Sequence, residues 1–152
     1  MTTKFTIPSG ELLVSDADHV ELERLVTEAA WRVDEGRADT LHELFTDDGV
    51  LVVGPNDLKG REAIRAWGRK LEEDHTYKCI RHAASNMRFT VVNEDEAEGV
   101  TLLTVFMDDE SSSSFPWVIG EDHDRFVRTE YGWRIKSRSW RQLFSRPSRE
   151  QP

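Results

Sequence analysis

Two residues of this 152-residue chain belong to the types that move protons, and their positions make them candidates for chemistry. Asp34 stands at the edge of the apolar stripe of an expected helix, and His82 lies early in a long expected strand. A carboxylate that faces the interior can hold a histidine ring and stabilise its protonated form, so that the ring becomes a better base. The residue types leave the orientation open, because an aspartate near a helix C-terminus is usually solvated and a lone histidine on an apolar strand is usually a core residue.

The helix that carries Asp34 is well defined by its pattern. Ser15 followed by Asp18 fits a capping box, in which side-chain oxygens satisfy free backbone N–H groups at a helix start. Apolar residues then recur on one face, at Leu22, Leu25, Val26, Ala29, Ala30 and Val33. Asp34 extends this face by one more turn, and Gly36 is expected to end the helix because glycine accepts the left-handed conformation.

Helical and extended segments should alternate over the next part of the chain. The expected order is a short helix over residues 41–45, a turn at 47–49, a strand over 50–53, a turn at 54–57 and a helix from about residue 60 to 71. The last of these rests on the helical spacing of Ala63, Ile64, Trp67 and Leu71. Together with the first helix, these segments provide about three helices ahead of the main strands.

From Lys78 onward the period of the apolar residues changes to two, which predicts a meander of strands over 79–92, 96–108, 115–129 and 132–143. In the first of these strands His82 and Ala84 share one parity, whereas Met87 and Phe89 share the other. A bulge near residues 85–86 would bring both sets to the core. The prediction is an α+β fold in which a curved, cone-shaped, antiparallel or mixed sheet encloses a pocket covered by the helices.

Four segments in a fixed order resemble the SnoaL-like branch of the nuclear transport factor 2 like superfamily. They are RVDEGRADTLHELFTDDGVLVV, KGREAIRAW, RHAASNMRF and DRFVRTEYGWRIKSR, and the likeness spans about residues 18–143. The superfamily includes scytalone dehydratase, ketosteroid isomerase, polyketide cyclases, bile-acid dehydratases, a dehydrochlorinase and the small subunits of ring-hydroxylating dioxygenases. A fold with so many uses does not decide a function.

The resemblance implies that Asp34 and His82 form a catalytic Asp/His dyad. Asp34 looks like the aspartate of the dehydratase and dehydrochlorinase members, and His82 looks like their partner histidine. Met107 stands where scytalone dehydratase would have a second histidine, and no tyrosine near Ala29 matches the phenols of several dehydratases. The implied reaction is proton abstraction followed by elimination from a cyclic, largely apolar small molecule, by a lyase or isomerase.

A pocket for such a molecule would be walled by aromatic and aliphatic side chains, with a few polar groups. The predicted lining consists of Trp31, Trp67, Asn86, Leu103, Phe106, Trp117, Asp124 and Trp140. Asn86 could orient a substrate oxygen or serve only as a bulge residue, and the tryptophans could be ordinary core residues. Asp124 has the parity of Phe126 and could point inward, whereas His123 is expected at an exposed edge.

Composition excludes several classes of partner. The net charge of −9 argues against nucleic acid and anionic membranes, which both need clustered lysine and arginine. The one basic run, at Arg134, Lys136, Arg138, Arg141, Arg146 and Arg149, is interpreted as a solvated strand edge or a subunit contact. A single cysteine, Cys79, excludes an internal disulfide. No apolar run of membrane-spanning length and no signal-peptide pattern are present, so a cytoplasmic location is expected.

No cofactor or metal is expected. The five histidines show no ligand spacing, and neither a glycine-rich phosphate loop nor GxSxG occurs. Two competing functions stay open: a non-catalytic small subunit of a ring-hydroxylating dioxygenase, and a ligand-binding module with an inert pocket. We expect one domain over residues 15–145, with an arm over 1–14 and a tail over 146–152, assembled as a homodimer or homotrimer.

Overall fold

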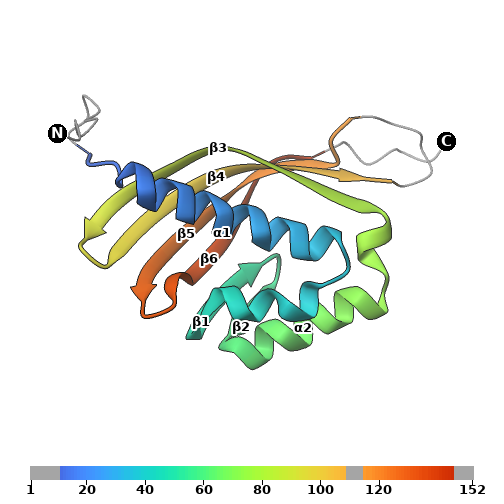
Figure 1. Ribbon diagram of the computed structural model, residues 1–152. Coiled ribbons are helices and arrows are strands. Elements are labelled where there is room, and N and C mark those ends of the chain that lie inside the picture. The colour runs from blue at the N-terminus through green and yellow to red at the C-terminus, as the bar shows by residue number, and fades with distance from the viewer. Residues whose placement is uncertain (1–10, 109–114, 146–152) are drawn as a thin grey trace.

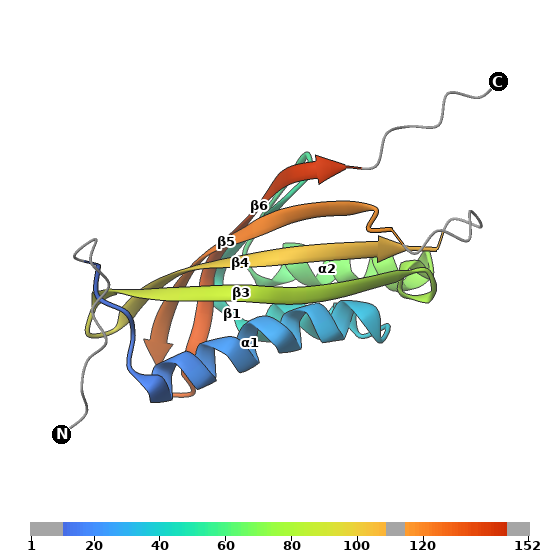
Figure 2. The same ribbon diagram turned by 90° about the horizontal axis from the view of Figure 1, so that it is seen from above.

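A computed structural model describes residues 11–108 and 115–145. One curved six-stranded sheet is covered on one face by two α-helices and two short 3₁₀ helices, as Figures 1 and 2 show from two directions. This arrangement confirms the predicted α+β class. No helix in the described part of the chain is long and apolar enough to cross a membrane.

Helix α1 (Asp16–Asp34) begins and ends as its sequence predicts. The Ser15 hydroxyl accepts a hydrogen bond from the backbone N–H of Asp18 at 3.2 Å, which caps the first turn. Gly36 takes a φ of 69° just beyond the last turn, a conformation that costs glycine little. Asp34 is therefore the last residue of a well-defined helix, and its place on that helix is set by the apolar stripe.

The segment after α1 differs in part from the prediction. A 3₁₀ helix, η1 (Ala38–Leu44), stands where a short helix was expected. The turn predicted at residues 47–49 is wrong, because these residues belong to β1 (Phe45–Val53), whose pairing with its neighbour shifts register between Phe45 and Val50. The Asp-Asp-Gly sequence is accommodated in this irregular stretch of strand. The chain then makes a short strand that was not predicted, β2 (Asn56–Lys59), which pairs with β1.

Helix α2 (Arg61–Glu73) and the 3₁₀ helix η2 (Thr76–Lys78) lead into the long strands. Gly68 on α2 touches η1 so closely that a Cβ atom there would lie 2.0 Å from the carbonyl oxygen of Ala38. Only glycine permits this approach of two helices. The contact fixes η1, and with it the connection that follows Asp34.

The predicted meander is present as β3 (Ile80–Asn93), β4 (Glu96–Met107), β5 (Val118–Thr129) and β6 (Gly132–Ser145). The order across the sheet is β2-β1-β6-β5-β4-β3, with β1 and β6 parallel and every other pair antiparallel. The predicted bulge is confirmed: register shifts between Ser85 and Arg88, where Asn86 has a φ of 48°. The sheet is therefore mixed, because β1 pairs in parallel with β6, the last strand of the meander.

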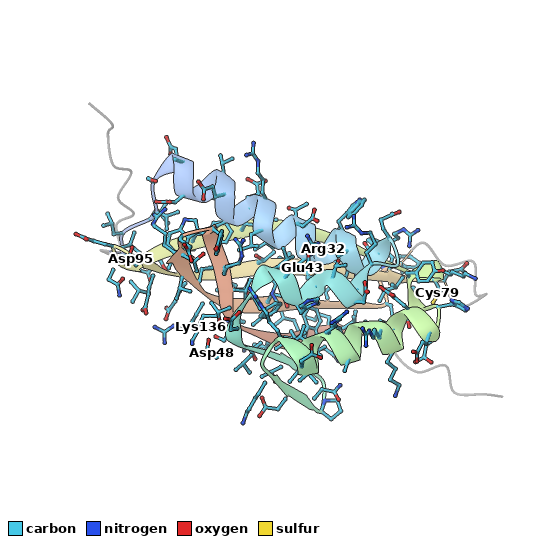
Figure 3. The ribbon with its side chains drawn as sticks, turned by 60° about the horizontal axis from the view of Figure 1, so that its bottom comes forward. Arg32, Glu43, Asp48, Cys79, Asp95 and Lys136 are labelled. Atoms are coloured by element: carbon cyan, nitrogen blue, oxygen red, sulfur yellow. The ribbon has the colours of Figure 1, made fainter. Side chains whose placement is uncertain are left out.

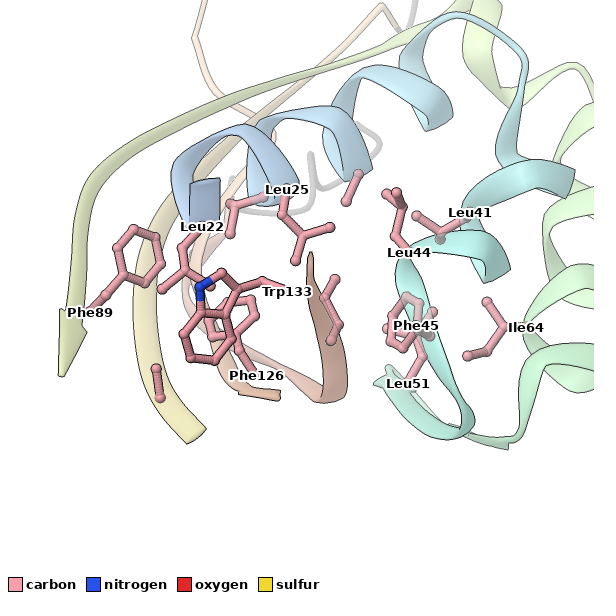
Figure 4. Close-up of a cluster of buried hydrophobic side chains, with 14 residues drawn as sticks. Leu22, Leu25, Leu41, Leu44, Phe45, Leu51, Ile64, Phe89, Phe126 and Trp133 are labelled. Carbon is pink, nitrogen blue, oxygen red and sulfur yellow. The ribbon is translucent and has the colours of Figure 1, made fainter. Parts of the chain in front are cut away.

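The main core lies between α1 and the sheet (Figure 4). Leu22 and Val26 of α1 are buried against strand residues that include Phe89 and Phe126, whose rings meet edge to face with centroids 5.8 Å apart. Trp133 completes this end of the core, and its indole N–H donates to Asp18 at 2.9 Å. The same core continues past α1 to Leu41, Leu51 and Ile64, and some of its members also border a cavity at the C-terminal half of α1.

Charged pairs link the elements around this core (Figure 3). Arg32 near the end of α1 contacts Glu43 of η1 at 2.9 Å, and Lys136 of β6 contacts Asp48 of β1. Along the edge of the sheet, the backbone of Leu12 and Leu13 pairs with β3. The remainder of the predicted arm, residues 1–10, and the tail 146–152 lie outside the described residues.

Candidate active site

Asp34 points inward and holds His82 by two hydrogen bonds. Its Oδ1 lies 2.6 Å from Nδ1 of the His82 ring, and its Oδ2 accepts the backbone N–H of His82 at 2.8 Å. Asp34 is buried, with 7% of its surface exposed, and the side chain of His82 is 14% exposed. Helix α1 supplies the carboxylate and strand β3 supplies the ring. The packing of α1 on the sheet therefore determines that the two side chains meet.

His82 borders a cavity of about 380 Å³, whereas Asp34 lies behind it and is not part of the wall. The wall is formed by the C-terminal half of α1, by α2 and by strands of the sheet. Most of it is apolar, with Val26, Ala29, Ala30, Val33, Leu41, Leu51, Val53, Trp67, Leu71, Ile80, Leu103, Val105, Trp117, Val118 and Trp140. The space suits a mostly apolar small molecule with the ring of His82 in its wall.

Four of the predicted lining residues, Trp67, Leu103, Trp117 and Trp140, do border this cavity. Trp140 lies against Gly120 of β5, where a Cβ atom would lie 2.5 Å from its indole ring. This close approach, which only glycine allows, is what lets the ring of Trp140 occupy its place on the cavity wall.

Three other predicted lining residues lie elsewhere. Trp31 is 46% exposed on another face of α1, where the Arg37 guanidinium stands 5.5 Å from its ring centre. Phe106 is 37% exposed, because strict alternation on β4 sends it away from the side of Leu103. Asn86 is exposed at the bulge, so it is a bulge residue and does not line the cavity.

A buried charged cluster, of which only Asp124 was predicted to face inward, contributes further polar groups to the wall. Arg138 of β6 donates to Asp124 of β5 through two hydrogen bonds of 2.7 Å each. Asp122, two residues before Asp124, lies 3.5 Å from Arg138. Asp122 and Arg138 border the cavity, whereas Asp124, the predicted inward carboxylate, is buried behind them.

The inward position of Arg138 corrects the interpretation of the basic run as a solvated edge. Lys136 is an extra residue in β6, since Ser137 pairs with Arg125 and Ile135 with Phe126. Trp133 and Ile135 face inward, so regular alternation would turn residue 138 outward. The extra residue reverses the alternation, and Arg138 therefore also faces inward. The parity change between Ile135 and Trp140 is the same signal that predicted the bulge in β3. His123, on the opposite parity of β5, is exposed as expected.

Burial governs the electrostatics of this cluster. Burial raises the pKa of Asp122 above the ordinary value of 3.8, and the neighbouring Asp124 acts in the same direction, while Arg138, His82 and His123 oppose it. Burial also disfavours the charge of Arg138, yet Asp124 and Asp122 hold its pKa above the ordinary value. Arg138 is thus a permanent cation that hydrogen-bonds to Asp124 and lies 3.5 Å from Asp122.

Within the described residues, no three histidine, cysteine or acidic side chains gather in the manner of metal ligands. The ionisable side chains that border the cavity are His82 on one wall and the Asp122–Arg138 pair on another.

Comparison with known proteins identifies the family and the fold of the chain. The model of the SnoaL-like domain family matches residues 16–139. No curated protein matches the sequence. Among solved structures, an NTF2-like protein with a cystatin-like fold from Novosphingobium aromaticivorans is similar, with 28% identity, coverage of 84% of this chain and 82% of that chain, and a TM-score of 0.70.

The similar structures with enzyme names include a dehydratase and a dehydrochlorinase. A candidate scytalone dehydratase from the same organism has 23% identity, covering 91% of this chain and 94% of that chain with a TM-score of 0.68. A type 2 hexachlorocyclohexane dehydrochlorinase has 17% identity, covering 90% and 95% with a TM-score of 0.69. At these identities the likeness establishes the shared fold.

Proposed function

Because the chain belongs to the SnoaL-like domain family, we propose that it is a cofactor-independent lyase or isomerase in which His82 abstracts a proton and Asp34 orients its ring. The substrate is a cyclic, largely apolar small molecule. The observation that carries this proposal is the 2.6 Å contact between Asp34 and Nδ1 of a histidine that borders an apolar cavity.

The two contacts of Asp34 support different roles for the two ring nitrogens of His82. Asp34 accepts the backbone N–H of His82 with one oxygen and meets Nδ1 with the other, so the carboxylate acts as the acceptor in both contacts. The ring proton then sits on Nδ1, and Nε2 carries the free electron pair. Within the described residues no side chain or backbone group bonds to Nε2, which leaves this nitrogen to meet a substrate.

Proton abstraction is favourable in such a place. When Nε2 takes a proton from carbon, the ring becomes a cation directly beside the Asp34 carboxylate, and this charge is stabilised without reorganisation of water. The electron pair released from the C–H bond forms a double bond, and a leaving group on the adjacent carbon departs with its own pair. Asp34 does not need to touch the substrate, so it is a positioning residue.

The comparisons support this class of reaction. Two structures that share the fold are named for a dehydratase and a dehydrochlorinase, and both names describe the loss of a small molecule from a larger one. The cavity volume of about 380 Å³ and its tryptophan-rich wall suit a substrate of one or two rings.

Hydrogen–deuterium exchange at carbon tests the proposal whatever the leaving group is, because it follows the abstraction step itself. The protein is incubated in D₂O with one- and two-ring ketones and with the matching β-hydroxy ketones, and NMR follows deuterium uptake beside the carbonyl and loss of water. Catalysis should be lost in His82→Ala and kept in His123→Gln, a variant of an exposed histidine. Equal rates for His82→Ala and the unchanged protein with every compound would favour an inert binding module or a non-catalytic subunit.

A further inference from the structure

We propose that Asp122 is the hydrogen-bond donor of this cavity, a neutral carboxylic acid that binds an oxygen atom of the substrate. In the elimination it also delivers its proton to that oxygen. The delivery step rests on the proposed function, whereas the binding role stands on the cavity alone. The substrate class is thereby narrowed to cyclic molecules that carry a carbonyl or hydroxyl oxygen.

The first support is that Asp122 is a cavity residue with unused hydrogen-bonding capacity. It is 6% exposed and borders the same space as His82. Its Oδ2 lies 3.5 Å from Nη1 of Arg138, beyond the usual length of an N–H···O hydrogen bond. Arg138 directs its two short hydrogen bonds to Asp124 instead. A buried carboxyl whose nearest cation lies beyond hydrogen-bond length is costly unless a ligand completes its hydrogen bonds.

The second support is the balance of charge around Asp122. The groups that act on it are His82 on β3, Asp124 and the exposed His123 on β5, and Arg138 on β6. Arg138 is matched by Asp124, and Asp34 contacts the ring of His82. An ionised Asp122 would leave a further buried negative charge with no cation of its own, and one bound proton removes it.

A third observation concerns Thr101, which pairs with Asp122 across β4 and β5. Thr101 is fully buried, and its hydroxyl has no hydrogen-bond partner among the described residues. Buried hydroxyls are normally bonded, so an unsatisfied one marks a place where a water molecule or ligand atom completes the network. Because Thr101 stands directly opposite Asp122 in the strand pair, its side chain lies on the same face of the sheet as the Asp122 side chain.

The proton balance of the elimination then closes. Nε2 of His82 takes the proton from carbon, the C–H electron pair forms the C=C bond, and the C–O bond breaks with its electrons on oxygen. The Asp122 carboxyl transfers its proton to that oxygen, and water leaves. The enzyme is left with a His82 imidazolium and an Asp122 carboxylate, and transfer of one proton from the first to the second restores both groups.

Infrared difference spectroscopy of the intact protein tests the protonation state directly. At pH 7 the carbonyl stretch of a protonated carboxylic acid is separate from the carboxylate bands. The spectrum of the unchanged protein minus that of Asp122→Asn should contain this acid band, and the same difference for the exposed Glu130→Gln should lack it. Absence of the band from the Asp122 difference would overturn the proposal.

Binding provides an independent readout that does not depend on turnover. Tryptophan fluorescence, reported by Trp67, Trp117 and Trp140, measures the affinity for 1-tetralone and for tetralin, which lacks the oxygen. The unchanged protein and Asp122→Asn, whose amide also donates, should prefer the ketone by about tenfold or more, and Asp122→Leu should lose the preference. A carboxylate at this position would repel the ketone, so a preference that appears only in Asp122→Asn would contradict the inference.

These results are separable from those on the proposed function. Loss of the acid band or of the ketone preference removes the role of Asp122 and leaves proton abstraction by His82 untouched. Unchanged exchange rates in His82→Ala would exclude the proposed catalytic function and leave Asp122 as a ligand-binding residue.

Discussion

Asp34 receives both N–H groups that His82 presents to it, the backbone N–H at 2.8 Å and the ring Nδ1 at 2.6 Å. The first contact holds the strand against the end of helix α1, and the second holds the ring. A single carboxylate therefore sets both the position of the residue and the orientation of its imidazole.

Replacing Asp34 with asparagine should keep the fold and lower turnover by about 10²–10⁴-fold. The amide oxygen can still accept one N–H of His82, but the charge that stabilises the imidazolium is gone. Steady-state kinetics on a compound found by the exchange screen measures the effect, with Glu35→Gln as a control for an exposed neighbour on the same helix end. Unaltered turnover would show that Asp34 serves only to hold β3.

Replacing Arg138 with methionine should destabilise the protein by about 3–5 kcal/mol, because the buried Asp124 carboxylate loses its hydrogen-bonded cation. The free energy of unfolding in denaturant measures the loss. Arg141→Met, at an exposed position of the same strand, is the matched control and should change little. Adding Asp124→Asn to Arg138→Met should recover part of the stability, and no recovery would argue against charge as the cause.

The stability of Asp122→Asn relative to the unchanged protein should rise with pH. The folded-state pKa of Asp122 lies above its ordinary value, chiefly because of burial. Its contribution to stability is therefore fully present below about pH 3.8 and is lost as pH rises through the folded-state pKa. Unfolding free energies from pH 3.5 to 8 should show the difference growing in favour of Asp122→Asn, while Glu130→Gln shows a flat difference.

Gly68→Ala should destabilise the protein by about 1–3 kcal/mol or more, although alanine is normally the better helix residue. The added methyl would collide with the Ala38 carbonyl and push η1 away from α2. Denaturant unfolding measures the change, and Arg69→Ala, an exposed neighbour, provides the helix-propensity control. A stabilised Gly68→Ala would mean that the two helices separate without cost.

The spacing of the apolar residues was sufficient to predict most of the helices and strands. Helix α1, helix α2, the four-stranded meander and the bulge near Asn86 follow from local spacing, because burial of one face imposes a period of 3.6 or 2 on the sequence. Strand β2 escaped notice because four residues with one half-buried side chain carry almost no pattern. The strand character of residues 47–49 escaped because Asp-Asp-Gly is the composition of a turn.

The Asp34 and His82 pair was expected from a family resemblance, and the apolar stripe placed Asp34 near the right face. The other residues of the cavity depended on finer geometry. Trp31 was expected beside Asp34, but a shift of three residues around a helix was enough to turn it to solvent. Arg138 appeared in the sequence as one of a run of basic residues, although the parity of Trp140 already indicated a change of face in that strand.

The sequence by itself determined both α-helices, the four long strands and most of the faces that they bury, since these depend on neighbours a few residues apart. Only the tertiary structure decided that Asp34 meets His82, 48 positions away, and that Asp122, Asp124 and Arg138 share one buried cluster. Such contacts depend on strand register and on single inserted residues. A shift of one residue sends a charged side chain to the opposite face of the sheet.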